Sequence, residues 1–374
     1  MTTWLKPVQQ LLKQNRWSGA KSYLTKYGLV LLPAIIDSHV HFRTPGQEYK
    51  ENWASASAAM AGGGVAGVID MPNNQPAITD SATLRQKIKL IKRQLKFPIK
   101  YFFYLGASAE KLPKRSALSQ VVGLKVYQGS TTGSLLVDNP KYLKKIFQSW
   151  PGLLSFHAEA ENLIKQRTEK YRHLTSANKH SLIRNYEVAT RAVRQVIGLA
   201  KKYHRTVYIC HVSTKQEIDL IKKAKKAGLK IFAEVSPHHL FLNQSVYKKL
   251  GNLAKVNPPL RTEADNQALW QAIKDGTIDV IATDHAPHLL KEKRLSYEKA
   301  PAGLPEIDTF LPLMLNAVNQ EKLSLNRLLE LVHYNPIKIF KLNGLEKSGA
   351  IVDLNLIKKS PKKKFKNQMR LVAL

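Results

Sequence analysis

Residues 33–42 read PAIIDSHVHF, an apolar run that ends in two histidines separated by one valine. Short runs rich in β-branched and aromatic residues, bounded by polar residues, are typical of buried strands. Seven further runs of this kind follow along the chain. They are VAGVIDMP (65–72), IKYFFYLG (99–106), VVGLKVY (121–127), LLSFHAE (153–159), TVYICHVS (206–213), LKIFAEVS (229–236) and DVIATDHAP (279–287).

Amphipathic stretches with helical spacing lie between many of these runs. The clearest are residues 81–96, 139–150, 181–203, 214–228 and 262–276, and residues 305–320, 324–334 and 335–344 follow the eighth run as closing helices. Strands that alternate with helices predict parallel βα units. The count predicts an α/β fold, a (β/α)₈ TIM-like barrel, with a doubly wound open sheet as the alternative.

Length and composition place the chain among ordinary globular proteins. Its 374 residues are 44% hydrophobic, which suffices for one large domain or two smaller ones. No apolar run is long enough for a membrane span, and residues 1–17 lack the apolar segment of a signal peptide. The single cysteine, Cys210, fits a reducing compartment. We therefore expect a cytoplasmic protein without a membrane partner.

The charge is strongly positive, with 59 Lys and Arg against 27 Asp and Glu and a net charge of +32. The basic residues are spread over segments that have the pattern of helix surfaces, and over a tail around Lys358–Lys366. No nucleic-acid-binding motif accompanies them. We interpret them as a solvated surface and expect no nucleic-acid function, although the tail could make a weak electrostatic contact.

Polar residues gather where the apolar runs end. These residues are His39, His41, Asn73, Lys125, His157, His211, His238 and Asp284. In a barrel the carboxyl ends of all strands meet on one face, where active sites lie. We therefore expect these side chains to share one site.

The histidines are candidate metal ligands. Residues two apart in a strand point the same way, so His39 and His41 can bind one ion, and neutral imidazole is a common zinc ligand. His157 and His211 repeat the pattern of an apolar run followed by a histidine, and Asp284 adds an oxygen ligand. An isolated pair would be read equally well as ordinary loop histidines. Surface or capping roles suffice for His173, His180, His204 and His333.

Lys125 is the unusual member of this set. A lysine that projects into a cluster of cations is repelled unless its charge is removed. A neutral amine can add CO₂ and become a carbamate, an anion with two oxygens that can bridge two metal ions. A lysine on the outer face of the strand stays open as the alternative.

At these residues the chain resembles the dihydroorotase family, in the cyclic-amidohydrolase branch of the amidohydrolase superfamily. The matching segments cover roughly residues 34–340 and occur in family order. They are DSHVHFRTPGQEYKE (37–51), AAMAGGGVAGVIDMPNNQP (58–76), VVGLKVYQGSTTG (121–133), HAEAE (157–161), YICHVSTKQEIDLIKKAKKAGL (208–229), AEVSPHHLFL (233–242), KVNPPLRTEAD (255–265) and ATDHAPH (282–288).

The resemblance implies a metal-dependent hydrolase barrel with two Zn²⁺ per subunit. His39, His41 and Asp284 would hold one ion, His157 and His211 the other, and carboxylated Lys125 would bridge them. The implied activity is the reversible cyclisation of N-carbamoyl-L-aspartate to L-dihydroorotate in pyrimidine biosynthesis. Asp284 would also be the catalytic residue that takes and returns the proton.

The resemblance also implies the residues that bind the substrate. They are Arg43, Asn73 and His288 for its carboxylate, Thr131 and Thr132 on a loop that closes over it, and Asn257. Arg43 offers the planar fork that suits a carboxylate. Cys210 and Glu234 fall beside the metal cluster, although packing explains them equally well.

Some features depart from the family pattern. Asn52 and Ala66 replace the usual residues of two motifs, and Glu306–Thr309 replace a stretch that borders the substrate pocket. We expect a flanking segment (1–33), the barrel (34–340) and a short strand with a basic tail (341–374), so the family's flanking β-sandwich is reduced or absent. A second subunit in a homodimer could then cover the flank.

Three other functions stay open. Another cyclic amidohydrolase, of the allantoinase or dihydropyrimidinase type, would share the metal cage without the carboxylate clamp. A non-catalytic relative could serve as a scaffold for aspartate carbamoyltransferase, although such relatives tend to lose metal ligands and this chain keeps them. Nucleic-acid binding through the basic surface would be steeply salt-dependent.

Overall fold

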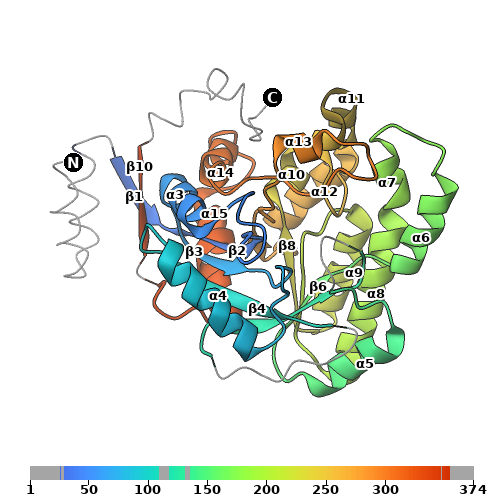
Figure 1. The fold of residues 1–374 in the computed structure, drawn as a ribbon, viewed down its shortest axis with the longest axis horizontal. Coiled ribbons are helices and arrows are strands. Elements are labelled where there is room, and N and C mark those ends of the chain that lie inside the picture. Colours follow the sequence, from blue (N-terminus) through green and yellow to red (C-terminus); the bar gives the residue numbers. More distant parts are fainter. Residues whose placement is uncertain (1–25, 27–28, 109–117, 131–134, 347, 354–374) are drawn as a thin grey trace.

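The computed structural model describes residues 26, 29–108, 118–130, 135–346 and 348–353 (Figure 1). Eight parallel strands form one sheet whose spatial order follows the chain. They are β2 (Ile35–Val40), β3 (Val65–Asp70), β4 (Lys100–Gly106), β5 (Val121–Tyr127), β6 (Leu154–His157), β7 (Val207–Ile209), β8 (Ile231–Val235) and β9 (Val280–Ile281). A parallel bridge between Val40 and His285 joins the first strand to the segment after the last. The predicted barrel is therefore confirmed, because the strand order of an open doubly wound sheet would reverse in its middle.

The helices surround this barrel. They are α3 (Trp53–Gly63), α4 (Ser81–Gln94), α5 (Pro140–Ser149), α6 (Glu161–Lys170), α7 (Lys179–Ile183), α8 (Tyr186–Tyr203), α9 (Lys215–Lys226), α10 (Pro237–Phe241), α11 (Tyr247–Leu250), α12 (Glu263–Lys274), α13 (Leu290–Lys293), α14 (Phe310–Asn319), α15 (Leu325–Leu329) and α16 (Asn335–Phe340). The described part of the chain also contains three short turns of other helix types: η1 (Gln244–Val246), η2 (Gly251–Ala254) and the π-helical η3 (Glu330–Tyr334).

Local sequence explains where several helices begin. Asp80 and Thr214 start α4 and α9 with side chains that accept hydrogen bonds from the first turn. Asn185 does the same for α8, which is why the predicted helix over residues 181–203 is divided into α7 and α8. Asn52, one of the departures from the family pattern, is the N-cap of α3 and forms a capping box with Ser55.

Two apolar layers stabilise the barrel, one on each face of the sheet. Alternate strand residues point to opposite faces. Ile35, Val68 and Phe103 pack outward against the helices, whereas Ile36, Ile69 and Tyr104 belong to a second cluster. This second cluster also contains Phe340, Leu342 and Leu345, so the segment around α16 packs against residues from the inner face of the sheet. The opposite, carboxyl end of the strands is left for polar residues.

Among the residues that the structure describes, the flank of the barrel carries a small two-stranded sheet and no sandwich. β1 (Leu29–Pro33) pairs antiparallel with β10 (Gly349–Asp353), and both lie at one edge of the molecule (Figure 1). The expected reduction of the sandwich is confirmed in this two-stranded form. Most of the expected N-terminal flanking segment and the basic tail lie outside the described residues, and the domain boundaries stay predictions.

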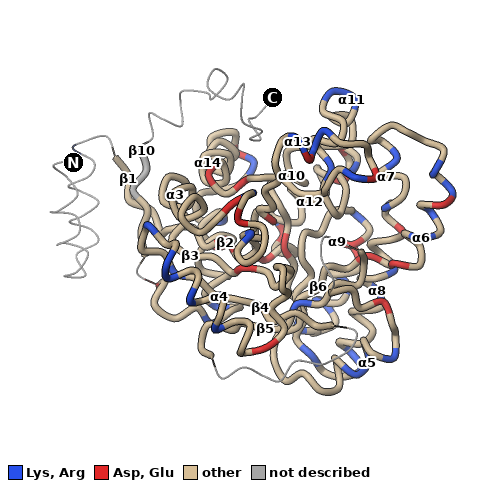
Figure 2. Tube along the Cα trace, viewed as in Figure 1, with Lys and Arg blue, Asp and Glu red and all other residues tan. Residues whose placement is uncertain are grey.

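The basic residues and the hydropathy of the helices also bear on the sequence-based expectations. Lysine and arginine are spread over many helices around the molecule (Figure 2). Of the helices that the structure describes, none is both long enough and apolar enough to cross a membrane.

Candidate metal centre

A polar cavity opens among the predicted site residues. Its lining is His39, His41, Arg43, Asn73, Lys125, Tyr127, His157, His211, Asn257, Asp284, Ala286, Ala302 and Gly303. Segments that are far apart in the sequence thus bring their polar residues to one mouth, as parallel strands of a barrel require. Of the remaining predicted site residues, His288 contacts Arg43 but does not line the cavity. Thr131 and Thr132 lie outside the described residues.

His39, His41 and Asp284 form one half of the centre. Asp284 Oδ1 lies 2.9 Å from Nε2 of His41 and 3.3 Å from Nε2 of His39. The opposite ring nitrogens are occupied: His39 Nδ1 donates to Glu234 Oε1 at 2.7 Å, and His41 Nδ1 donates to Asn73 Oδ1 at 2.6 Å. Such outer hydrogen bonds fix the tautomer and direct Nε2 toward an ion.

His157 and His211 form the other half. Nδ1 of His157 and Nε2 of His211 lie 2.9 Å apart. His157 Nε2 donates a hydrogen bond to Glu159 Oε2 at 2.9 Å. Lys125, on β5, is fully buried in the same cavity, with its Nζ 2.9 Å from Cys210 Sγ. Lys125 therefore faces the barrel interior, so the outer-face alternative is wrong.

The electrostatics of the centre favour a cation beside Asp284. Burial opposes a charge on His39, but Glu234 and Asp284 together raise its pKa to about 10. Burial alone would raise the pKa of Asp284, yet His39 and His41 hold it well below its usual value. Burial lowers the pKa of His41 to about 4, and burial together with His157 lowers the pKa of His211. His41 and His211 are therefore neutral, the form in which an imidazole binds a metal, and a bound ion would take the place of the proton on His39.

Two members of the centre have strained backbones. Asp284 has φ 54° and His211 has φ 35°, in the left-handed region that side-chain-bearing residues rarely adopt. Strain of this kind concentrates at functional sites, where the surrounding structure maintains it.

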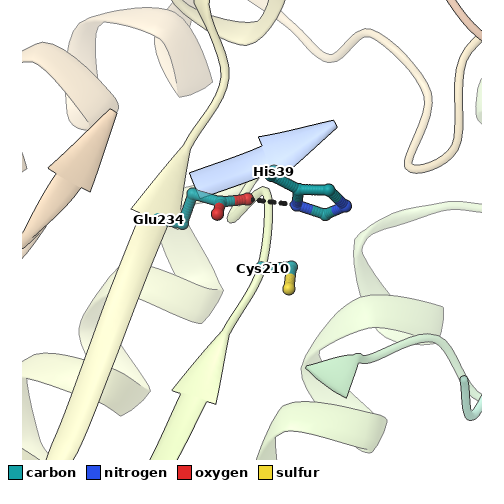
Figure 3. A group of neighbouring side chains, drawn as sticks. All are labelled: His39, Cys210 and Glu234. Atoms are coloured by element: carbon teal, nitrogen blue, oxygen red, sulfur yellow. Dashed lines mark hydrogen bonds and ion pairs between the residues drawn. The ribbon is translucent and has the colours of Figure 1, made fainter. Parts of the chain in front are cut away.

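Glu234 contacts one residue in each half of the centre. Its carboxylate accepts from His39 Nδ1, from the backbone N of His211 at 3.0 Å and from the hydroxyl of Tyr208 at 2.8 Å. Figure 3 shows Glu234 on β8 beside Cys210 and the ring of His39, and these three offer donor atoms within 4.8 Å of one another. The contacts of Glu234 orient residues of the centre, which packing alone would not explain.

The residues present fit a metal ion. Among the described residues, the buried Nδ1 of His211 has no hydrogen-bond partner. His39, His211 and Asp284 also offer nitrogen and oxygen donors within 4.8 Å of one another. Imidazole nitrogens and a carboxylate oxygen are a typical zinc donor set.

The substrate side of the cavity is polar as well. Arg43 Nε donates to the carbonyl of Pro287 at 3.0 Å, and its Nη2 lies 3.2 Å from His288 Nε2. Arg43 is therefore held against the wall of the cavity by His288, which is not part of the lining. Asn257 Oδ1 is buried without a hydrogen-bond partner among the described residues, so it can accept from a bound molecule.

Sequence reasoning missed the residues that support the ligands. Glu159 binds His157 and is paired with Arg184, which also donates to the carbonyl of Ser130. Burial opposes its charge, but Arg184 lowers the pKa of Glu159 to about 2. The sequence HAEAE gave a signal for Glu159, which follows the predicted ligand His157 by two residues. It gave none for Arg184, which lies in a different helical segment.

Two histidines were wrongly expected near the surface. His180 is buried and lies 2.8 Å from both the carbonyl of Val256 and the hydroxyl of Tyr297. His333 is buried and its Nδ1 donates to the carbonyl of Ala34 at 2.8 Å. His204, in contrast, caps the C-terminus of α8 as expected. Glu306, a departure from the family pattern, is buried and pairs with His238 at 3.0 Å.

Comparison with known proteins identifies the class. A model of the amidohydrolase family matches residues 30–133. The chain is 34% identical over 362 residues to a dihydroorotase of Methanosarcina acetivorans, covering 94% of this chain and 78% of that protein. It is 36% identical over 335 residues to the multifunctional protein CAD of Squalus acanthias, covering 88% of this chain and 13% of that protein.

The fold also matches solved structures. The L-hydantoinase of Arthrobacter aurescens superposes with a TM-score of 0.79 at 24% identity, covering 86% of this chain and 74% of that one. Fold and site together define an amidohydrolase-type enzyme. Within that class, the chain belongs to the dihydroorotase family.

Proposed function

We propose that this protein is a dihydroorotase, which closes N-carbamoyl-L-aspartate into L-dihydroorotate and reopens it in pyrimidine biosynthesis. One observation carries the proposal: a guanidinium fork, Arg43, lines the same cavity as the histidines and Asp284. Dihydroorotate presents both groups that such a cavity recognises, a cyclic amide and a carboxylate. The family relatives support this choice.

The metal ligands are assigned as the sequence predicts. His39, His41 and Asp284 would hold one Zn²⁺, and His157 and His211 a second. Carboxylated Lys125 would supply the anion between them. When bound, the ions supply Lewis-acid activation of the attacking water and of the amide carbonyl.

The chain's own groups orient the substrate and move the proton. Arg43, with Asn73 and His288, would hold the carboxylate through a bidentate contact. Asn257 Oδ1 would accept from a ring N–H. Asp284, which touches His39 and His41, would take a proton from the attacking water and deliver it to the departing ring nitrogen. Thr131 and Thr132 are proposed to close over the substrate.

A direct assay tests the proposal against the other cyclic amidohydrolases. Ring opening is measured with dihydroorotate, allantoin and dihydrouracil, and ring closure with carbamoyl-aspartate. We expect turnover of dihydroorotate and carbamoyl-aspartate. Turnover of only allantoin or dihydrouracil would reject the assignment. Metal-loaded protein without turnover of any of them would support a scaffold instead.

Two partners are proposed. One is a second copy of this chain, packed against the flank that carries the two-stranded β1–β10 sheet, and the other is an aspartate carbamoyltransferase, the enzyme that produces the substrate. Analytical ultracentrifugation of the protein alone and mixed with that enzyme tests both partners. A monomer that does not change its sedimentation in the mixture would reject them.

A further inference from the structure

We propose that Lys87 is a positioning residue for the Arg43 clamp, an inference that rests on the proposed function. Lys87 lies on α4, is 1% exposed, and does not line the catalytic cavity. It shares the inner face of the helix with Leu84 and Ile91, the other buried residues of α4. An ammonium on such an apolar face is costly to bury unless it is paired and hydrogen-bonded.

Two side chains near the end of β3 supply those partners. Lys87 Nζ lies 2.7 Å from Asp70 Oδ2 and donates to Asn74 Oδ1 at 2.6 Å. Asp70 is fully buried and Asn74 is 9% exposed. The ring of Phe103 lies below the ammonium, with its centroid 5.3 Å away. These residues form a closed unit, the Asp70–Asn74–Lys87 cluster.

The cluster holds the backbone on both sides of Arg43. The backbone N of Phe42 donates to Asp70 Oδ1 at 3.0 Å. Asn74 Nδ2 donates to the carbonyl of Phe42 at 2.9 Å and to the carbonyl of Thr44 at 3.1 Å. Because the cluster is hydrogen-bonded to the backbone of both neighbours of Arg43, the position of the cluster fixes where the Arg43 guanidinium enters the cavity.

Lys87 orients the members of the cluster that make these contacts. Its bond to Asn74 Oδ1 leaves the amide nitrogen facing the two carbonyls. Its ammonium lies against Asp70 Oδ2, which leaves Asp70 Oδ1 to accept from the backbone N of Phe42. A buried ion pair is by itself weak support for stability, since apolar residues of similar volume often do as well. In contrast, displacement of a substrate-binding group by about 1 Å can reduce activity on the order of 100-fold.

The test compares Lys87→Met with Lys89→Met, an exposed lysine on the same helix. We expect Lys87→Met to raise KM for dihydroorotate about tenfold, with kcat changed by less than about threefold. Lys89→Met should keep both values. In the Arg43→Met background, adding Lys87→Met should change KM by less than about twofold, because the clamp is already lost.

The variants distinguish this inference from the proposed function. Wild-type protein without turnover of dihydroorotate would reject only the proposed function. A crystal structure of Lys87→Met then still tests the positioning role, since residues 42–44 should shift. If Lys87→Met does not fold, Asn74→Ala removes the same backbone contacts without removing a charge, and both readouts apply to it. Unchanged KM, unchanged positions of residues 42–44, or an equal rise in KM with and without Arg43 would overturn the proposal.

Discussion

Glu234 is the single residue whose replacement should show most clearly how the centre is organised. Its carboxylate accepts hydrogen bonds from His39 and from the backbone of His211, one residue in each half of the centre. Glu234→Gln keeps the shape but removes the charge that orients His39. We expect metal affinity to fall about 10–100-fold, measured by competition with a chelator. Glu263→Gln, an exposed site at the start of α12, is the control. Equal affinity in both variants would show that Glu234 only packs.

His180 should make stability depend on pH. Burial, with Arg184 nearby, lowers its pKa to about 3 from an ordinary value of 6.5. Between these values the unfolded chain binds a proton that the folded chain does not. Its contribution is therefore complete above pH 6.5 and is lost as the pH falls toward 3. In His180→Gln, the free energy of unfolding should fall less steeply than in wild type as the pH drops below 6.5. The two slopes should differ by about 1.4 kcal/mol per pH unit.

Denaturant unfolding at pH 7 and pH 5.5 measures this difference. Only the slope with pH is informative, because His180→Gln also changes the contacts with Val256 and Tyr297. The same slope for wild type and variant would contradict a neutral, buried His180.

The residues that sequence reasoning found and missed differ in a physical way. His39, His41 and Asp284 could be found because each stands at the end of an apolar run, and barrel geometry then brings such ends together. Lys87 and Arg184 were missed because their partners lie on other elements of the fold. In residues 81–96, Lys87 is one lysine among several, and only its place between Leu84 and Ile91 was a signal.

Among the elements, the segment that carries Gly303 should tolerate a larger side chain poorly. Gly303 lines the cavity with φ +142°, and a Cβ there would lie 2.6 Å from the carbonyl oxygen of Ala286. We expect Gly303→Ala to destabilise the fold by about 2 kcal/mol and to lower kcat/KM. Gly198→Ala, on the exposed face of α8 with nothing within 4 Å of the new Cβ, should stabilise by up to about 1 kcal/mol. Thermal unfolding of both variants is the measurement, and equal shifts would contradict the predicted close contact.

The strands were more predictable than the helices. Each predicted apolar run contains one strand of the barrel, since a buried parallel strand needs an apolar sequence. α3 and α6 were not predicted, because α3 is rich in small residues without a polar face and α6 is polar on most of its surface. Their helical form depends on caps and packing against the barrel rather than on a local pattern.

For the whole molecule, metal should stabilise the fold. Ligands from β2, β6 and the segments after β7 and β9 meet in one cavity, so an ion that binds there favours the folded chain over the unfolded one. The gain is RT ln(1 + [L]/Kd), about 2.7 kcal/mol at 100-fold over Kd. Removal of metal with a chelator should therefore lower Tm, and added Zn²⁺ should restore it. In His41→Asn the same titration should move Tm much less, and an equal response would place the ion elsewhere.

Metal content and ring closure, measured together on wild type and Lys125→Ala, test most directly whether these groups form one catalytic centre. Lys144→Ala, an exposed lysine on α5, is the control. We predict two zinc ions per chain and cyclisation of carbamoyl-aspartate in wild type and control, with both largely lost in Lys125→Ala. Lys125→Ala protein with wild-type zinc content and turnover would contradict the proposed centre.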